Sequence, residues 1–351
     1  MSAAQWALLL LPAVLAAAAI AMLRNSALAP ALADRPNERS LHERPTPRVG
    51  GIALLGAALP VAALGADFHV GVLLACAALL AVVSAMDDVR SLPVQVRLPA
   101  HVAAAAVALL AIAGPRVGHE GWNVLQLAVA LVAIAWMSNL FNFMDGADGL
   151  AGGMALIGFG ALACAAERAG AIPLAWCAGA LASASVGFLA WNFPPARVFL
   201  GDAGSIPLGF LAATLGSLGT LEGAWPWWFA PLVFAPFIAD ATVTLCRRLA
   251  AGEVIWRAHR RHAYQRLVLG GWSKRRLALA AYALMSASAL AALAALRAEA
   301  EFRYVIISVS VVVHALILGA VELRHPMHGA PAGTPGDGSS NNNKGNRRDG
   351  T

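Results

Sequence analysis

The chain has 351 residues, of which 59% are hydrophobic and 13% are charged, and its mean hydropathy is +0.68. Apolar runs of about twenty residues recur along it, which is typical of an α-helical protein that crosses a membrane several times, and they leave no stretch long enough for a separate soluble domain. The net charge of +6 reflects membrane topology and attraction to anionic headgroups rather than nucleic-acid binding. The four cysteines lie in or beside apolar runs without metal-ligand spacing, and we interpret them as packing residues.

The apolar runs predict an all-α polytopic integral membrane protein of about 10–11 transmembrane helices. The predicted spans are 5–23, 50–66, 69–86, 98–114, 124–143, 150–166, 172–192, 205–220, 226–245, 277–297 and 303–322. We expect residues 1–325 to form one transmembrane domain with functional loops on its cytoplasmic face. Residues 326–351, most of which are Gly, Ser, Asn and Pro or charged, are expected to be a disordered cytoplasmic tail.

The basic residues predict the orientation of these spans. Of the 25 Lys and Arg residues, 21 lie in the segments 24–48, 87–97, 193–203, 246–276 and 323–351. By the positive-inside rule these segments face the cytoplasm. The N-terminus is therefore expected outside and the C-terminus in the cytoplasm, and every motif described below lies on the cytoplasmic side.

The first of these segments ends in residues 44–51, with the sequence Arg-Pro-Thr-Pro-Arg-Val-Gly-Gly. Its two prolines exclude a regular helix, and its two glycines allow the backbone to approach a ligand or a neighbouring helix closely. Taken alone, this is a weak signal.

An acidic pair, Asp87 and Asp88, follows the third span. Adjacent carboxylates repel each other unless a cation lies beside them. Arg90 and Arg97 are close enough in sequence to meet a phosphate on a membrane-embedded lipid, and the alternative is that they anchor the helix at the membrane surface. For an isolated pair of this kind a solvated loop is the more common explanation.

The polar stretch 138–153 follows the fifth span. If its first part is helical, Asn139, Asn142 and Asp145 are offset by only about 60° each around the helix axis, so they form one polar stripe that can face a ligand. Asp148 follows three residues later, and both aspartates precede glycine. The alternative is a helix that ends in a solvated turn at the two Asp-Gly pairs.

The segment 199–210, Phe-Leu-Gly-Asp-Ala-Gly-Ser-Ile-Pro-Leu-Gly-Phe, follows the seventh span. Ser205 is expected to cap the next helix, with Pro207 in its first turn, which leaves free backbone N–H groups beside Asp202. A helix N-terminus of this kind can bind a diphosphate. A plain capping turn with a spare aspartate is equally consistent with the spacing.

The largest cytoplasmic loop contains His259, Arg260, Arg261 and His262. Each guanidinium group can bind two phosphate oxygens at once, so the cluster suits a polyanionic ligand. Zinc is disfavoured, because no Cys or third His accompanies the two histidines. Attraction to the membrane surface is the alternative. Asp240 lies inside the ninth apolar run, where an ionisable group usually faces a cleft or a partner.

Taken together, these segments resemble the polyprenyl-phosphate N-acetylhexosamine-1-phosphate transferase family, which includes phospho-N-acetylmuramoyl-pentapeptide transferase. The resemblance covers about Pro45 to Leu267 and rests on Pro-Thr-Pro-Arg-x-Gly-Gly, Asp-Asp, Asn-x-x-Asn-x-x-Asp-Gly-x-Asp-Gly-Leu-Ala and Phe-Leu-Gly-Asp-x-Gly-Ser. Many members carry consecutive histidines where this chain has His262-Ala263-Tyr264-Gln265, which resembles the branch that initiates O-antigen synthesis.

The resemblance implies transfer of a sugar 1-phosphate from a UDP-N-acetylhexosamine to a polyprenyl phosphate such as undecaprenyl phosphate. The products are a lipid diphospho-sugar and UMP, and the cofactor is Mg²⁺, with Mn²⁺ as an alternative. It implies a bacterial inner-membrane enzyme of cell-envelope polysaccharide synthesis, with a homodimer as the assembly to test. The expected metal ligands are Asn142 and Asp202, and the expected catalytic residues are Asp87, Asp88, Asp145 and Asp148. The expected substrate-binding residues are Arg90, Arg97, Asn139, His259, Arg260, Arg261 and His262.

Charge considerations favour direct attack of the ionised lipid phosphate over a covalent aspartyl intermediate, because a phosphate monoester is already mostly ionised above its second pKa of about 6. Two other classes are weighed against this function. A secondary transporter would place its binding residues near the membrane midplane. A CDP-alcohol-type phosphotransferase would carry Ala-Arg after its Asp-Gly, which this chain lacks after both of its Asp-Gly pairs in 145–149.

Overall fold

The computed structural model describes residues 2–34, 36, 41, 44–90, 92–114, 124–254 and 259–327, and almost all of their regular structure is helical. Within these ranges the strands are β1 (Ala33–Asp34) and β2 (Thr46–Pro47), which pair antiparallel with Ala33 opposite Pro47. From residue 328 onward the predicted disordered tail lies outside the described residues.

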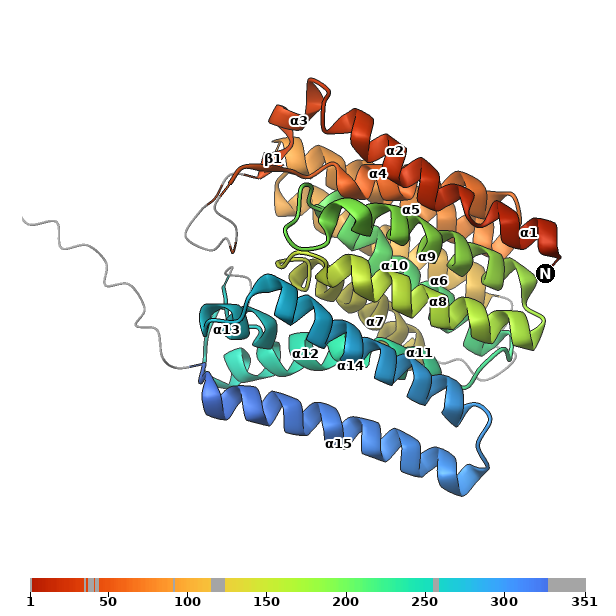
Figure 1. The fold of residues 1–351 in the computed structure, drawn as a ribbon. Coiled ribbons are helices and arrows are strands. Elements are labelled where there is room, and N and C mark those ends of the chain that lie inside the picture. The colour runs from red at the N-terminus through yellow and green to blue at the C-terminus, as the bar shows by residue number, and fades with distance from the viewer. Residues whose placement is uncertain are drawn as a thin grey trace, which may run out of the picture.

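The helices lie side by side along one common direction (Figure 1). They are α1 (Ala3–Leu8), α2 (Leu11–Leu23), α3 (Leu28–Ala31), α4 (Gly50–Ala63), α5 (Phe68–Arg90), α6 (Val94–Ala113), α7 (Val124–Phe143), α8 (Leu150–Ala169), α9 (Ile172–Asn192), α10 (Asp202–Leu221), α11 (Phe229–Val233), α12 (Ala235–Ala250), α13 (Ala263–Leu269), α14 (Lys274–Ala295) and α15 (Ala300–Arg324). In the described part of the chain, nine helical stretches, one of them made of α1 and α2 together, are long and apolar enough to cross a membrane. The all-α polytopic prediction is confirmed.

Two predicted spans differ from the structure. The run at 50–66 forms α4, whose 14 residues are fewer than a straight crossing needs. The run at 226–245 is divided into α11 and α12, which meet at Phe234. The break coincides with Pro236 in the first turn of α12, a residue that has no N–H to continue the preceding helix.

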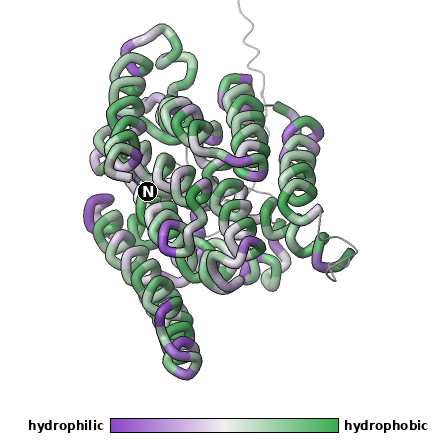
Figure 2. Tube along the Cα trace, turned by 90° about the vertical axis from the view of Figure 1, so that its right-hand side faces the viewer, coloured by the Kyte–Doolittle hydropathy of each residue, from purple (hydrophilic) through white to green (hydrophobic). Residues whose placement is uncertain are grey.

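The centre of the bundle is α10, which packs against α5 and α7. In α10, 78% of the apolar window is buried, compared with 17% in the peripheral α15. Figure 2 shows hydrophobic colour along the outer helices as well, which suits helices that face lipid rather than water. A polar residue at the start of α10 is therefore held among several neighbouring helices.

The two glycines of the 44–51 segment allow α4 to begin directly against α10. The N–H groups of Gly50 and Gly51 donate to the carbonyl oxygens of Phe199 and Leu200, at 2.9 and 2.8 Å. A Cβ on Gly51 would overlap the backbone of Gly204 and lie 2.6 Å from the Leu200 oxygen. The predicted close approach to a neighbouring helix is confirmed.

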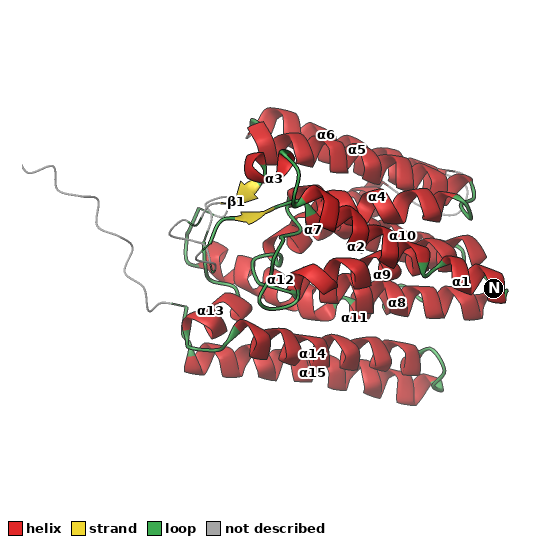
Figure 3. Cartoon of the chain, turned by 45° about the horizontal axis from the view of Figure 1, so that its top comes forward, coloured by secondary structure: helices red, strands yellow, loops and turns green. Residues whose placement is uncertain are grey.

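We call the end of the bundle that carries the β1–β2 pair and α13 the loop end. In Figure 3 the strands, α13 and several connecting loops gather there, whereas α1 lies toward the opposite end. The last turn of α15 also lies at the loop end, because Arg266 of α13 donates to Glu322 at 2.7 Å. The first and last described helices thus begin and end at opposite ends of the bundle, as an odd number of passes requires.

Candidate active site

Three aspartates from separate helix ends converge at the loop end, and we call Asp88, Asp145 and Asp202 the acidic cluster. Asp88 lies in the last turn of α5, Asp145 in the turn between α7 and α8, and Asp202 is the first residue of α10. The Asp88 carboxylate accepts a hydrogen bond from the Ala203 N–H at 3.2 Å. The Asp145 carboxylate accepts one from the N–H of Gly201. Both carboxylates are therefore held at the N-terminus of α10.

The acidic cluster has an excess of negative charge. Burial raises the pKa of Asp145 well above its usual range, and the charge of the neighbouring Asp202 raises it further. The counter-charge is Arg48, which follows β2 and contacts Asp34 at 2.8 Å and Asp88 at 3.2 Å. Its charge also acts on Asp202. One guanidinium shared with a fourth carboxylate cannot balance the cluster.

Arg48 is a site residue for which the sequence analysis proposed no role. It lies forty positions from Asp88 in the chain, so spacing alone does not relate the two. The sequence feature that could have indicated Arg48 is its position in the Pro-Thr-Pro-Arg-x-Gly-Gly segment, whose glycines pack against the N-terminal turn of α10.

Asn142 borders the acidic cluster through Ser205. The Ser205 hydroxyl lies 2.9 Å from Asn142 Oδ1 and 3.2 Å from the carbonyl oxygen of Gly201. The expectation that Ser205 caps the helix is wrong, because α10 begins at Asp202 and its N-cap is Gly201, whose φ is +73°. Glycine adopts this left-handed conformation readily, so the helix starts earlier and Asp202 lies in its first turn.

Asp87 points toward a different set of partners from Asp88. Its two oxygens accept from the Leu92 N–H and from Arg97 Nη1, both at 2.6 Å. Consecutive residues of a helix are rotated by about 100°, so the two carboxylates cannot share one partner set. Arg97 lies in the first turn of α6, and Arg90 is exposed in the last turn of α5.

Two of the other predicted residues are engaged away from the cluster. Asp148 is buried and accepts from Lys274 Nζ and from the Ala196 N–H, both at 3.0 Å. It joins the start of α8 to the start of α14. Asn139 donates to the carbonyl oxygen of Ala135 one turn earlier in α7. Of the predicted polar stripe, the structure therefore brings only Asn142 and Asp145 to the cluster.

The loop of residues 259–262, which we call the histidine loop, packs against the turn that carries Asp145. The rings of His259 and His262 are 4.8 Å apart, and His262 stacks on Phe143, the last residue of α7. The Tyr264 hydroxyl donates to the Phe143 carbonyl at 2.9 Å. Burial, followed by the charges of His262 and two nearby arginines, lowers the pKa of His259 to about 3, so this ring is neutral at pH 7.

The arginines of this loop differ in their availability. Arg261 is paired with Glu253, whereas Arg260 is exposed. Asp240, predicted to face a cleft or a partner, accepts the N–H groups of Ala263 and Tyr264 at 2.8 and 3.2 Å and so caps α13. Arg260 is the residue of this group best placed to meet a soluble anion.

The oxygen donors of the acidic cluster fit a hard divalent cation. Carboxylate and amide oxygens are the ligands that Mg²⁺ and Mn²⁺ prefer, and the single guanidinium of Arg48 does not balance the negative charge of the cluster. Among the described residues, the group of three whose ligand atoms lie within 4.8 Å of one another is instead Asp67, His69 and Glu222. Asp67 lies in the α4–α5 loop, His69 in the first turn of α5 and Glu222 directly after α10. Arg48 contacts Asp88 within the cluster, and its charge also acts on Asp202.

Comparison with known proteins identifies the family. A model described as glycosyl transferase family 4 matches residues 70–219, a range that contains the whole acidic cluster. The chain is 30% identical over 276 residues to the undecaprenyl-phosphate alpha-N-acetylglucosaminyl 1-phosphate transferase of Yersinia pestis, covering 72% of this chain and 73% of that protein. It is 27% identical to a probable undecaprenyl-phosphate N-acetylglucosaminyl 1-phosphate transferase of Bacillus subtilis, covering 71% and 73%. It is 29% identical to the decaprenyl-phosphate N-acetylglucosaminephosphotransferase of Mycobacterium tuberculosis H37Rv, covering 70% and 71%. The family expected from the sequence motifs is confirmed, and the chain belongs to glycosyl transferase family 4.

Proposed function

We propose that this protein transfers an N-acetylhexosamine 1-phosphate from a UDP-sugar to a polyprenyl phosphate and releases UMP. The observation that carries the proposal is the convergence of Asp88, Asp145 and Asp202 around Arg48 at one end of a membrane-spanning bundle. Two phosphate-bearing substrates could meet there, one from the membrane and one from water. The printed names of the relatives favour N-acetylglucosamine 1-phosphate as the group transferred and undecaprenyl phosphate as the acceptor.

We propose that Asp202 and Asn142 hold Mg²⁺, with Asp88 and Asp145 beside them and Mn²⁺ as the alternative ion. The ion would neutralise the charge that develops on the transferred phosphoryl group. The support is the donor chemistry and the uncompensated charge of the cluster. Arg48 holds Asp88 in place at the edge of this site.

On the lipid side we assign the phosphate to Arg97 and Arg90, at headgroup depth beside the acidic cluster. Both oxygens of Asp87 are engaged by Arg97 and by the Leu92 N–H, which suits a residue that orients Arg97 better than a covalent nucleophile. The proposed reaction is therefore direct attack by the ionised lipid phosphate on the sugar-linked phosphorus. Incubation with the labelled UDP-sugar alone should leave no sugar phosphate covalently bound to the protein.

On the nucleotide side we assign Arg260 to the diphosphate of the soluble donor. His259, Arg261 and His262 shape the loop that presents it, since His262 packs on Phe143 and Arg261 on Glu253. A neutral His259 would contribute a hydrogen bond rather than a charge.

We propose a bacterial inner-membrane location with the loop end in the cytoplasm. The support is the concentration of Lys and Arg in the loops of that end. Reporter proteins fused after Arg90, Gly204 and Arg266 should all read cytoplasmic, and a reporter in 115–123 should read periplasmic. A periplasmic reading at any of the three would separate the proposed site between two compartments. The homodimer stays a prediction, to be checked by the mass of the purified protein in nanodiscs.

The decisive experiment is to follow UMP release by the purified protein with polyprenyl phosphate and a panel of UDP-N-acetylhexosamines. A secondary transporter would release no UMP, and a CDP-alcohol-type enzyme would require a cytidine nucleotide. The position of the acidic cluster at helix ends, rather than at the midplane, already disfavours transport. Loss of surface polysaccharide in cells that lack the protein would test the proposed role in initiating O-antigen-like synthesis.

A further inference from the structure

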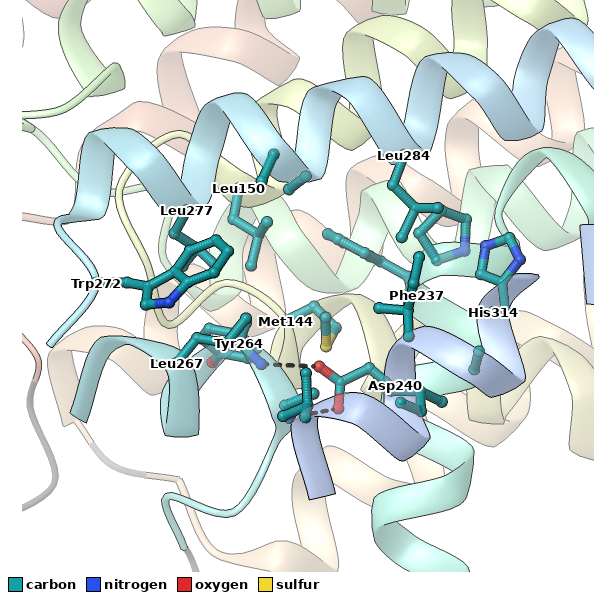
Figure 4. A pocket seen from close by; sticks show the side chains of 18 of the residues that line it. Met144, Leu150, Phe237, Asp240, Tyr264, Leu267, Trp272, Leu277, Leu284 and His314 are labelled. Atoms are coloured by element: carbon teal, nitrogen blue, oxygen red, sulfur yellow. Dashed lines mark hydrogen bonds between the residues drawn. The ribbon is translucent and has the colours of Figure 1, made fainter. Parts of the chain in front are cut away.

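A cavity distinct from the acidic cluster lies between α12, α13, α14 and α15 (Figure 4). It is open on one side and has a volume of about 430 Å³, within the range of about 300–1,000 Å³ typical of small-molecule sites. Its walls are mainly aliphatic and aromatic, and in Figure 4 Leu150, Phe237, Leu267, Leu277 and Leu284 surround it. The interior is suited to a hydrocarbon chain rather than to a polar ligand.

Three hydrogen bonds hold the residues between this cavity and the turn that carries Asp145. Asp240 accepts the N–H groups of Ala263 and Tyr264, and the Tyr264 hydroxyl donates to the Phe143 carbonyl. Met144 lines the cavity, whereas the next residue, Asp145, interacts with Asp202. Tyr264 and Met144 therefore lie between the apolar cavity and the carboxylates of the cluster.

The rim of the cavity at the loop end is positively charged. Arg276 in the first turn of α14 and Arg324 in the last turn of α15 both line it, as does His325. Arg276 lies 4.1 Å over the ring of Trp272, and neither Arg276 nor Arg324 forms an ion pair with another of the described residues. The nearby carboxylate of Glu322 is already held by Arg247 and Arg266. At the loop end, the apolar cavity is thus bordered by a tryptophan and by two guanidinium groups that have no carboxylate partner within the described part of the chain.

We propose that this cavity binds one acyl chain of an anionic glycerophospholipid, with its phosphate held by Arg276 and Arg324. An apolar void inside a bilayer forfeits dispersion contacts, and a lipid chain is the apolar group available to fill it. The two unpaired arginines select an anionic headgroup, because guanidinium binds phosphate oxygens by charge-assisted hydrogen bonds. The bound chain supports α13, which lines the cavity with Ala263, Tyr264 and Leu267 and carries the histidine loop at its start.

The test is lipid retention, which requires no enzymatic activity and so can fail or succeed independently of the proposed function. The protein is placed in phosphatidylcholine nanodiscs with increasing phosphatidylglycerol, released, and examined by native mass spectrometry. We expect one retained phosphatidylglycerol and no comparable phosphatidylcholine. The double variant Arg276→Gln/Arg324→Gln should weaken this retention at least tenfold. Arg275→Gln, which makes the same charge change at the neighbouring exposed residue outside the cavity, should leave it unchanged.

A second pair of variants tests the cavity itself without changing charge. Ala281→Leu places extra carbon atoms in the cavity and should reduce retained phosphatidylglycerol, whereas Ala283→Leu, an exposed neighbour on α14 that does not line it, should not. Equal retention of both phospholipids would overturn the proposal. So would retention of polyprenyl phosphate or detergent in place of phosphatidylglycerol, or retention that survives both the arginine and the Ala281 changes.

Discussion

Replacing Arg48 by Gln isolates the role of the cation inside the acidic cluster. The change keeps a polar side chain, shorter than that of arginine, and removes the charge that contacts Asp34 at 2.8 Å and Asp88 at 3.2 Å. The Asp88 side chain is only 2% exposed, so water cannot replace the lost partner there. The variant should therefore have an acidic cluster with more uncompensated negative charge than the wild type.

The size of the effect follows from the exposure of both partners. A hydrogen bond to a charged group contributes about 1.5–3 kcal/mol. The Arg48 side chain is 35% exposed, and solvent screening places the effect near the lower limit, at about 1.5 kcal/mol. That corresponds to roughly a tenfold fall in kcat/KM, since about 1.4 kcal/mol is a factor of ten.

The direction of the metal dependence is the sharper part of this prediction. Added negative charge repels both phosphate-bearing substrates but attracts a dication, so the KM values should rise while the half-saturating Mg²⁺ concentration stays equal or falls. UMP release is measured across Mg²⁺ and substrate concentrations for Arg48→Gln and for Arg44→Gln, an exposed residue of the same segment. The Arg44 variant should match wild type. A rise in half-saturating Mg²⁺ for Arg48→Gln alone would refute its role as the counter-charge.

Four further variants test the proposed metal site, the division of substrates and the packing of the helices. Asp202→Asn should abolish transfer while the protein still inserts and accumulates, because losing a charged ligand costs several kcal/mol of transition-state stabilisation. Near-normal turnover at saturating Mg²⁺ would show that Asp202 is not a metal ligand. Arg97→Ala should raise KM for polyprenyl phosphate, and Arg260→Ala should raise KM for the UDP-sugar, each about ten- to a hundredfold; effects on kcat alone would contradict this division. Gly51→Ala should lower the free energy of unfolding by about 1–3 kcal/mol, because its Cβ would overlap backbone atoms that cannot move aside. The loss is measured as a lower melting temperature. Gly56→Ala, which has open space around it, is the control.

Local pattern was sufficient to predict the fold class and the end of the bundle where the acidic cluster lies. Apolar runs report burial in lipid one helix at a time, and loop charges report their side of the membrane, so neither needs tertiary contacts. The same reasoning predicted Asp88, Asp145 and Asp202 at one end of the bundle, because each lies at the end or the start of an apolar run on the same side of the membrane. The close approach of Gly51 was also predictable, since glycine beside a helix start permits it.

Side-chain partners depended on how the helices rotate and pack. Asp148 and Lys274 are 126 positions apart, and their contact exists only because α8 and α14 begin side by side. Asp87 and Asp88 are adjacent in sequence, yet the rotation of the last turn of α5 sends one to Arg97 and the other to Arg48. Periodicity predicts which faces of a helix are apolar, but ion pairs across the bundle follow from the relative placement of whole helices, which no local pattern contains.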